Sequence, residues 1–361
     1  MTDLFKKTKK KIDGVPEPPI KKEQPPKEEK NTEAKPVDFS QMILGKTKEE
    51  SLKGDITEGV TDAHLSDEEE TMKLYVSSVK VMRDIFEAYK SGSEVNRAEV
   101  VGVASKIVNN ITAGSQDLLK FFHELDSAQE YNYHNAVNVA ILSVEIGIAY
   151  KFDKSTLLDL AVIGLLHDLD LIKSKHLTDK PEKLSKKELE EIKNHSLNTA
   201  IYVDNAFKFS EKMITAILQH HEREQGQGYP VGLAEGNIHD MALIIGIADT
   251  YEAMIHSRPY KERSAPNIAI INIINSGKEL FPNRTIKALV ARVGLYPMGT
   301  WVELNTGEIC KVIKINSDSP LRPVVNILKD KNKNEFREIR TIDLKKIPSL
   351  YIRHTVEEMS L

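Results

Sequence analysis

The sequence predicts a mainly α-helical protein, with helices over residues 66–293 and a small β-rich module over residues 294–361. Apolar residues recur at three- and four-residue spacing through most of the first range, as they do on amphipathic helices. After Leu295 the pattern changes to short alternating apolar runs separated by polar, turn-forming residues, which is typical of β-strands. A chain start rich in Lys, Pro and Glu predicts a disordered tail ahead of the helices.

Residues 1–65 are predicted to form this disordered tail and an acidic linker. Residues 1–36 contain 6 of the 15 prolines and 10 lysines against 7 acids, so they cannot bury enough apolar surface to fold. Between residues 37 and 70 the charge reverses, with ten acids and three lysines. No apolar run in the chain is long enough for a membrane span, and the start lacks the apolar core of a signal peptide.

Net charge and cysteine content narrow the classes of function. The chain has 50 Lys and Arg against 54 Asp and Glu, and this net charge of −4 argues against a nucleic acid polymer as a partner. The single cysteine, Cys310, excludes a disulfide framework and a Cys-rich zinc site, and indicates a reducing, cytoplasmic location. Any bound metal must therefore be held by His, Asp and Glu.

Residues 66–122 are predicted to form N-terminal helices. Ser66 to Glu69 has the form of a capping box, so order is expected to begin at Ser66. Met72, Val79 and Phe86 then fall on one helix face. These helices can complete the core, receive a signal or form a dimer interface; we predict a homodimer through this face.

The β-rich module begins with a predicted hairpin. Residues 300–304 and 309–315 alternate as strands around a Gly-containing turn at residues 305–308. Residues 324–328 and 335–339 are predicted as two further strands.

Metal-binding side chains interrupt or end several of the apolar helical segments. His167 and Asp168 end a buried run and need a partner there, because unpaired polar groups are costly in an apolar environment. Glu130 and His134 are four residues apart on a predicted helix. The other candidate ligands are His195, His220, His221 and Asp249. Eight nitrogen and oxygen ligands without sulfur suit two or three octahedral ions such as iron or manganese better than one tetrahedral zinc.

The order of these residues resembles that of a known family. His134, His167-Asp168 and Asp249 are similar to the H…HD…D pattern of HD-superfamily phosphohydrolases. The additional His195 and His220-His221, followed by Gly228-Tyr229-Pro230, resemble the HD-GYP subfamily of cyclic dinucleotide phosphodiesterases. The resemblance covers residues 66–344.

The resemblance implies an HD-type helical bundle with its catalytic domain at residues 123–293, and a centre of two or three divalent metal ions, iron or manganese. By similarity, one ion would be held by His134, His167, Asp168 and Asp249, a second by His195, His220 and His221 with Asp168 bridging, and a third by Glu130. The substrate pocket would be lined by Gly228, Tyr229 and Pro230, while Arg258 and Lys261 would contact phosphate and act in catalysis with Asp168. Glu222 and Glu252 are candidates to orient the imidazoles.

The implied function is hydrolysis of cyclic di-GMP to pGpG, and onward to GMP, by a metal-bridged hydroxide. Two alternatives stay open: an HD-GYP-type hydrolase of another cyclic dinucleotide, and a cyclic di-GMP receptor or scaffold that binds partner proteins such as GGDEF diguanylate cyclases. Leu171 bears on this choice, because the family usually has a phosphate-facing lysine there. Lys173 or Lys175 would have to reach the same place.

Overall fold

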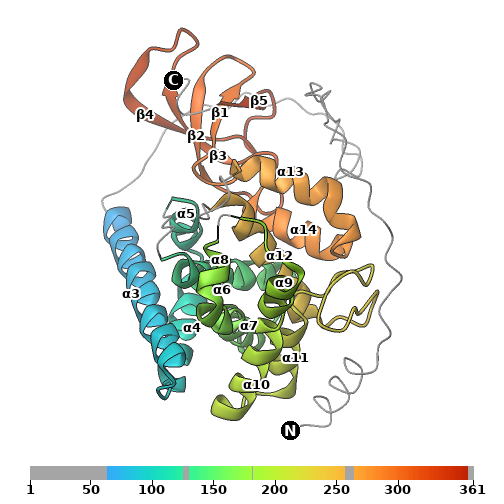
Figure 1. Ribbon diagram of the computed structural model, residues 1–361. Coiled ribbons are helices and arrows are strands. Elements are labelled where there is room, and N and C mark those ends of the chain that lie inside the picture. Colours follow the sequence, from blue (N-terminus) through green and yellow to red (C-terminus); the bar gives the residue numbers. More distant parts are fainter. Residues whose placement is uncertain (1–62, 125–129, 181, 257–263, 357–361) are drawn as a thin grey trace. The chain divides into compact units, whose positions relative to one another are not determined.

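Helices precede a small sheet along the chain, and this confirms the predicted fold class (Figure 1). The structure is a computed structural model that describes residues 63–124, 130–180, 182–256 and 264–356. The helices are α3 (Ala63–Ser91), α4 (Arg97–Thr112), α5 (Asp117–Glu124), α6 (Tyr131–Ala149), α7 (Lys154–Leu166), the 3-10 helix η1 (Leu169–Ser174), α8 (Lys175–Thr178), α9 (Lys186–Lys193), α10 (His195–Phe207), α11 (Glu211–Gln219), α12 (Asp240–Ile255), α13 (Pro266–Ser276), the 3-10 helix η2 (Gly277–Glu279) and α14 (Asn283–Val293).

Helices α6, α7 and α12 form the core of the helical part, since they are apolar on nearly every side. All residues from Asn135 to Gly147 of α6 are buried. Helices α6 and α7 pack so closely that a Cβ atom added at Gly164 would lie 2.6 Å from the Cα atom of Ala140. This close packing fixes the position of each helix, and of the polar side chains it carries, relative to the other.

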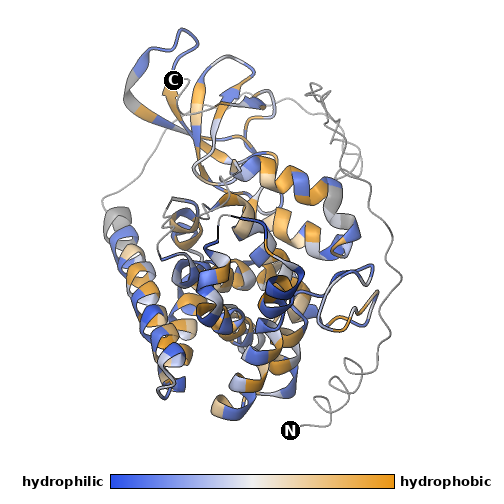
Figure 2. Cartoon of the chain, in the orientation of Figure 1, coloured by the Kyte–Doolittle hydropathy of each residue, from blue (hydrophilic) through white to orange (hydrophobic). Residues whose placement is uncertain are grey.

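Helix α3 packs its apolar stripe against the rest of its own chain. It begins at Ala63, so the predicted cap residue Ser66 lies inside the helix. Both apolar and polar residues occur along α3 (Figure 2). Val79 and Phe86 are only 5% and 0% exposed, so these two residues cannot form the predicted dimer seam, whereas Met72 is half-buried and the homodimer itself stays a prediction. The stripe instead completes the core.

Two segments predicted as continuous helices are interrupted at ligand-type residues. The pattern over residues 157–171 predicts one helix, but α7 ends at Leu166 and η1 begins at Leu169. Likewise, α9 and α10 divide the segment 186–206 at Asn194. His167 and His195 therefore lie next to helix ends, where backbone carbonyls are left for other partners.

The C-terminal strands form one antiparallel sheet in the order β4-β3-β2-β1-β5. They are β1 (Trp301–Leu304), β2 (Ile309–Lys314), β3 (Val324–Lys329), β4 (Glu335–Asp343) and β5 (Ile352–Thr355). The predicted hairpin is confirmed, with Val302 opposite Cys310. Strand β5 was not predicted, because its four residues include the polar Arg353 and His354 and show no alternation.

Side chains join the β-rich module to the helices at several places in the described part of the chain, one of them the 3.2 Å bond from the Asn267 amide of α13 to the Thr355 hydroxyl of β5. Gln116, between α4 and α5, donates from Nε2 to the Ile315 carbonyl at 3.2 Å and accepts from the Ile315 N–H at 3.0 Å. Arg292 of α14 donates to the Glu145 carboxylate at 2.6 Å and to the Ser317 hydroxyl at 3.3 Å. The β-rich module is thus attached at the loop before α5, at α13 and at the end of α14.

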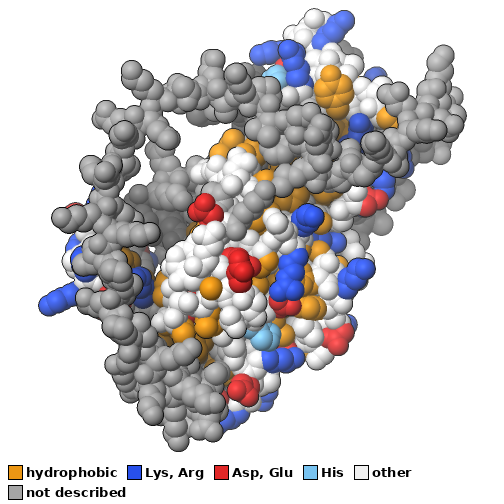
Figure 3. Space-filling view, turned by 90° about the vertical axis from the view of Figure 1, so that its right-hand side faces the viewer, with side chains coloured by type: hydrophobic (Ala, Val, Ile, Leu, Met, Phe, Trp, Pro, Cys, Tyr) orange, Lys and Arg blue, Asp and Glu red, His pale blue; other side chains and the backbone are white. Residues whose placement is uncertain are grey.

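In the described part of the chain, no helix combines the length and the apolar character that a bilayer crossing requires. Acidic and basic side chains are interspersed on the described surface that Figure 3 shows. The predicted tail lies outside the described residues up to residue 62, and the remaining residues 63–65 belong to α3.

Candidate metal centre and pocket

Ligand-type side chains from four parts of the helical domain meet at one place. They are His167 and Asp168 between α7 and η1, His195 at the start of α10, His220 and His221 after α11, and Asp249 on α12. Their donor atoms form two groups that share Asp168, one with His195, His220 and His221 and the other with His167 and Asp249. Within each group the donor atoms lie within 4.8 Å of one another, so each group can hold a cation.

Three of the imidazoles have the same orientation, which their own backbone sets. The Nδ1 atoms of His167, His195 and His220 lie 2.6–2.8 Å from the carbonyl oxygen three residues earlier in the chain. A carbonyl only accepts, so each Nδ1 carries the proton and donates it. The Nε2 atom of each ring then faces the centre with a free lone pair, as a metal ligand requires.

These Nε2 atoms surround the carboxylate of Asp168. They approach its oxygens at 3.3 Å from His167, 3.1 Å from His195 and 3.4 Å from His220. Lone pairs facing a carboxylate repel it, so the arrangement requires positive charge between them. In addition, His167 Nε2 and Asp168 Oδ1 are buried without a hydrogen-bond partner among the described residues. The residues therefore fit divalent cations bound here.

The pKa shifts of Asp168 and His167 also indicate that positive charge is favoured at the centre. Burial opposes the charged form of Asp168, but His167 and His195 outweigh it and hold the pKa of the carboxyl well below its usual range. Against the same burial, Asp168 and Asp249 hold the pKa of His167 well above its usual value. Burial and the neighbouring histidines lower the pKa of His221.

Glu130 and His134 lie outside these two groups. Glu130 occupies the N-cap position of α6, and its side chain forms an ion pair with Arg83 of α3. His134 Nδ1 lies 3.1 Å from the hydroxyl of Tyr75, also on α3. The sequence did not predict Tyr75 or Arg83 as neighbours of these two residues, although Tyr75 lies on the same helix as Met72, Val79 and Phe86.

The two acids expected to orient imidazoles have different partners. Glu222 accepts the backbone N–H groups of Val231 and Leu233 at 2.7 and 2.8 Å, and so shapes the loop before α12. Glu252 is fully buried and accepts from Asn135 at 2.9 Å and from Tyr131 at 2.7 Å. Backbone carbonyls, not these acids, orient the imidazoles that surround Asp168.

The Gly228-Tyr229-Pro230 segment lies against the histidines, and its Tyr229–Pro230 peptide is cis. The Tyr229 ring stacks on His221 with centroids 4.6 Å apart. Gly228 is required by close approach, because a Cβ atom there would lie 2.5 Å from the backbone of His221 and Glu222. Of the three residues, only Tyr229 lines the pocket described below.

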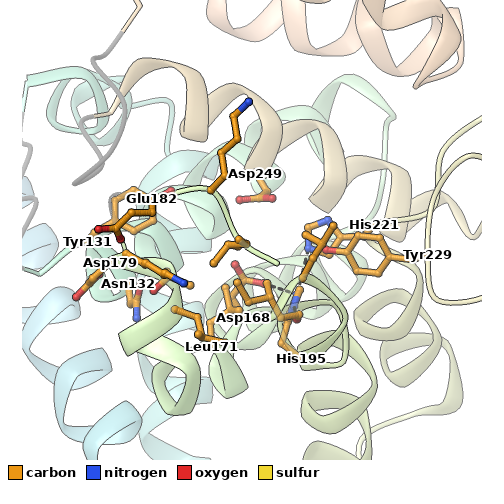
Figure 4. A pocket seen from close by; sticks show the side chains of 17 residues that line it. Tyr131, Asn132, Asp168, Leu171, Asp179, Glu182, His195, His221, Tyr229 and Asp249 are labelled. Carbon is orange, nitrogen blue, oxygen red and sulfur yellow. Dashed lines mark hydrogen bonds and ion pairs between the residues drawn. The ribbon is translucent and has the colours of Figure 1, made fainter. Parts of the chain in front are cut away.

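A pocket of about 540 Å³ opens onto the centre. Figure 4 shows Asp168 between His195, His221 and Tyr229 on one side and Tyr131, Asn132, Asp179 and Glu182 on the other. Leu171, at the position of the family's lysine, also lines the pocket. This volume is within the range of small-molecule sites.

None of the basic residues expected near the substrate is among the described residues that line the pocket. Lys173 pairs with Asp170 at 3.7 Å and Lys175 with Asp179 at 2.8 Å, and neither lines the pocket. Among the described residues that line it, the basic ones are instead Lys180 and Lys183, which sequence reasoning missed because they lie between helices. Arg258 and Lys261 lie outside the described residues.

Comparisons with known proteins show which domains and proteins this chain is similar to. A model of the HD domain matches residues 120–281, and a model of the KOW domain associated with the HD domain matches residues 301–361. The chain is 27% identical over 287 residues to the cyclic di-GMP phosphodiesterase PdeB of Borreliella burgdorferi, across 78% of this chain and 75% of that protein. It is 27% identical over 244 residues to the cyclic di-GMP phosphodiesterase PA4108 of Pseudomonas aeruginosa, across 67% and 58%.

Two further likenesses concern substrate and fold. The chain is 29% identical over 177 residues to 3'3'-cGAMP-specific phosphodiesterase 1 of Vibrio cholerae, across 49% of this chain and 37% of that protein. The solved structure of Bd1817, an HDG"Y"P protein from Bdellovibrio bacteriovorus, matches with a TM-score of 0.52 at 21% identity, across 62% of this chain and 71% of that chain. At this identity the match confirms the HD-type fold.

Proposed function

We propose that this chain, which carries an HD domain, is an HD-GYP-type metal-dependent phosphodiesterase that hydrolyses cyclic di-GMP to pGpG and onward to GMP. Its relatives support the broader statement, a phosphodiesterase of cyclic dinucleotides. The observation that carries the proposal is the Asp168 carboxylate, which three Nε2 atoms face at 3.1–3.4 Å beside a pocket.

The proposed metal ligands follow from the two donor groups. Asp168 would bridge two ions, one held with His195, His220 and His221 and the other held with His167 and Asp249. His134 would join His167 and Asp249 as a ligand of the second of these ions. Glu130 would hold a third ion. Nitrogen and oxygen donors without sulfur favour iron or manganese. When bound, such ions lower the pKa of coordinated water and neutralise phosphate charge.

The side chains of the pocket have separate proposed roles. Tyr229, stacked on His221, presents a flat aromatic wall on which a purine base can stack. The backbone bonds of Glu222 hold the loop after Tyr229 in place. Arg258 and Lys261 are proposed to contact phosphate, as the family resemblance implies.

A second candidate substrate is 3'3'-cGAMP. It is favoured by the likeness to the Vibrio cholerae enzyme and by Leu171, which replaces a cation that the family directs at phosphate. Both candidates are cyclic dinucleotides and use the same centre.

The test uses the full chain loaded anaerobically with Fe(II) or Mn(II), with metal content measured in every preparation. Cyclic di-GMP, pGpG and 3'3'-cGAMP are supplied separately, and the products are separated by chromatography. We expect cleavage of cyclic di-GMP, and we expect Asp168→Asn to lose both metal and turnover by more than the roughly 100-fold that loss of an outer hydrogen bond causes.

The control is Glu190→Gln, which changes an exposed carboxylate on α9 and should leave metal content and turnover unchanged. Faster cleavage of 3'3'-cGAMP than of cyclic di-GMP would favour the second candidate. Metal-loaded protein that binds these nucleotides but cleaves none of them would reject the enzyme and support the receptor alternative.

A further inference from the structure

A buried chain of hydrogen bonds links α12 to α6 through a residue of α3. The Glu252 carboxylate accepts from the Asn138 side-chain amide at 3.3 Å. The amide oxygen of Asn138 accepts from the Tyr75 hydroxyl at 2.8 Å, and that hydroxyl lies 3.1 Å from His134 Nδ1. Tyr75, Asn138 and Glu252 are at most 1% exposed, so each bond is protected from water.

The bond between Glu252 and Asn138 determines which group donates and which accepts in each of the following hydrogen bonds. The Glu252 carboxylate accepts from the NH2 group of Asn138, so the amide oxygen of Asn138 is turned toward Tyr75. Tyr75 has a single hydroxyl proton, and it is donated to this oxygen. The hydroxyl oxygen can then only accept from His134, so Nδ1 of His134 carries a proton.

His134 thereby has the same protonation as the three imidazoles around Asp168. Those three donate from Nδ1 to carbonyls near helix ends. His134 lies within the first turns of α6, where following residues already use the backbone carbonyls, so its acceptor comes from another helix. In all four imidazoles the proton then lies on Nδ1 rather than on Nε2.

We propose that Tyr75 is a positioning residue that holds His134 in its Nδ1–H form, under the direction of Asn138 and Glu252, and so prepares Nε2 to bind metal. This inference rests on the proposed function in one respect, that His134 is a metal ligand. It makes α3, which precedes the matched HD-domain residues 120–281, a part of the metal centre.

Tyr75→Phe tests the proposal, since it removes the hydroxyl and keeps the ring that packs 5.9 Å from the His134 imidazole. In metal-free protein labelled with 15N-histidine, long-range 1H–15N correlations should show His134 in the Nδ1–H form in the wild type and a mixture of both forms in the variant. Calorimetry with Mn(II) should show one class of ion bound about 10- to 100-fold more weakly.

Tyr150→Phe is the matched control. It removes a tyrosine hydroxyl that bonds Thr285 at 2.6 Å and takes no part in the hydrogen bonds between Glu252, Asn138, Tyr75 and His134. It should leave the His134 spectrum and the Mn(II) isotherm unchanged. Equal weakening of Mn(II) binding in both variants would indicate general destabilisation and overturn the proposal. An unchanged His134 spectrum in Tyr75→Phe would overturn it as well.

Glu252→Gln is a second variant, because an amide at this position can donate to Asn138 and turn its amide group around. The Tyr75 hydroxyl would then face an NH2 group and donate to His134 instead, so the spectrum should shift toward the Nε2–H form. Since the spectra require neither metal nor turnover, a protein that hydrolyses no cyclic dinucleotide can still show them, which separates this proposal from the proposed function.

Discussion

At the scale of single residues, Lys183 is the first target for substitution. It is exposed, lines the pocket and forms no ion pair within the described residues, whereas Lys180 pairs with Glu188 at 2.7 Å. We expect Lys183→Ala to raise KM for cyclic di-GMP about three- to tenfold with little change in kcat, since an exposed lysine contributes modestly to phosphate binding. Steady-state kinetics at low ionic strength measures this.

The control for Lys183 is Lys187→Ala, an exposed lysine on α9 that does not line the pocket. It should leave KM unchanged. Adding Leu171→Lys to Lys183→Ala should restore part of the lost affinity, because residue 171 lines the same pocket. Equal KM values for wild type and Lys183→Ala would show that Lys183 does not contact the substrate.

The candidate centre could be predicted in part from sequence. The order of His167, Asp168 and Asp249 identified residues that the structure brings together, because imidazoles and carboxylates seldom interrupt apolar runs unless they pair or bind a metal. Their orientation could not be predicted, since it depends on which backbone carbonyls helix ends leave free. Tyr75 contacts His134 from 59 residues away, and no local pattern encodes such a pairing.

At the scale of helices, the contact between α6 and α7 is tested by Gly164→Ala. The added Cβ would lie 2.6 Å from the Ala140 backbone, so the helices must separate. We expect a loss of about 1–3 kcal/mol in the free energy of unfolding, the usual cost of overpacking. Mn(II) binding should weaken as well, because His134 and His167 lie on or next to these helices. Urea unfolding and calorimetry measure the two effects.

Gly102→Ala on α4 is the matched control, since a Cβ there meets nothing within 4 Å. In a helix this change should raise the unfolding free energy by about 0.5–1 kcal/mol. If Gly164→Ala were as harmless as Gly102→Ala, the α6–α7 contact would be more adaptable than its geometry implies.

Helices were predicted better than their ends. Apolar periodicity predicts helices over residues 133–150, 211–221 and 241–256, which agree with α6, α11 and α12 within a few residues because burial on one or all sides dominates their sequences. The breaks at His167 and Asn194 escaped prediction, since no glycine or proline marks them and the imidazole bonds that accompany them form only after folding.

At the scale of the whole molecule, Arg292 connects the helical core to the β-rich module. Its partner Glu145 is 1% exposed. We expect Arg292→Ala to lower the unfolding free energy by about 3–5 kcal/mol, because it leaves a buried charge unpaired. Replacing both residues, Glu145→Leu with Arg292→Met, should recover most of this loss, since no charge then remains buried.

The loss in Arg292→Ala should also depend on pH. Burial raises the pKa of Glu145 despite the opposing charge of Arg292, and removing Arg292 raises it further. A carboxyl whose pKa is higher in the folded state favours folding at low pH, and this contribution disappears as pH rises through the folded-state pKa. The deficit measured by urea unfolding should therefore shrink between about pH 8 and pH 5. A deficit independent of pH would mean that Glu145 is not the cause.

The two hydrogen bonds between Gln116 and the backbone of Ile315 determine which substitutions these two positions can accept. Both bonds go to the backbone of residue 315, so they do not depend on which side chain stands there. Position 116 must keep a primary amide of this length, whereas position 315 is restricted only by its own packing. A substitution at position 315 that keeps its packing should therefore leave both bonds to Gln116 in place.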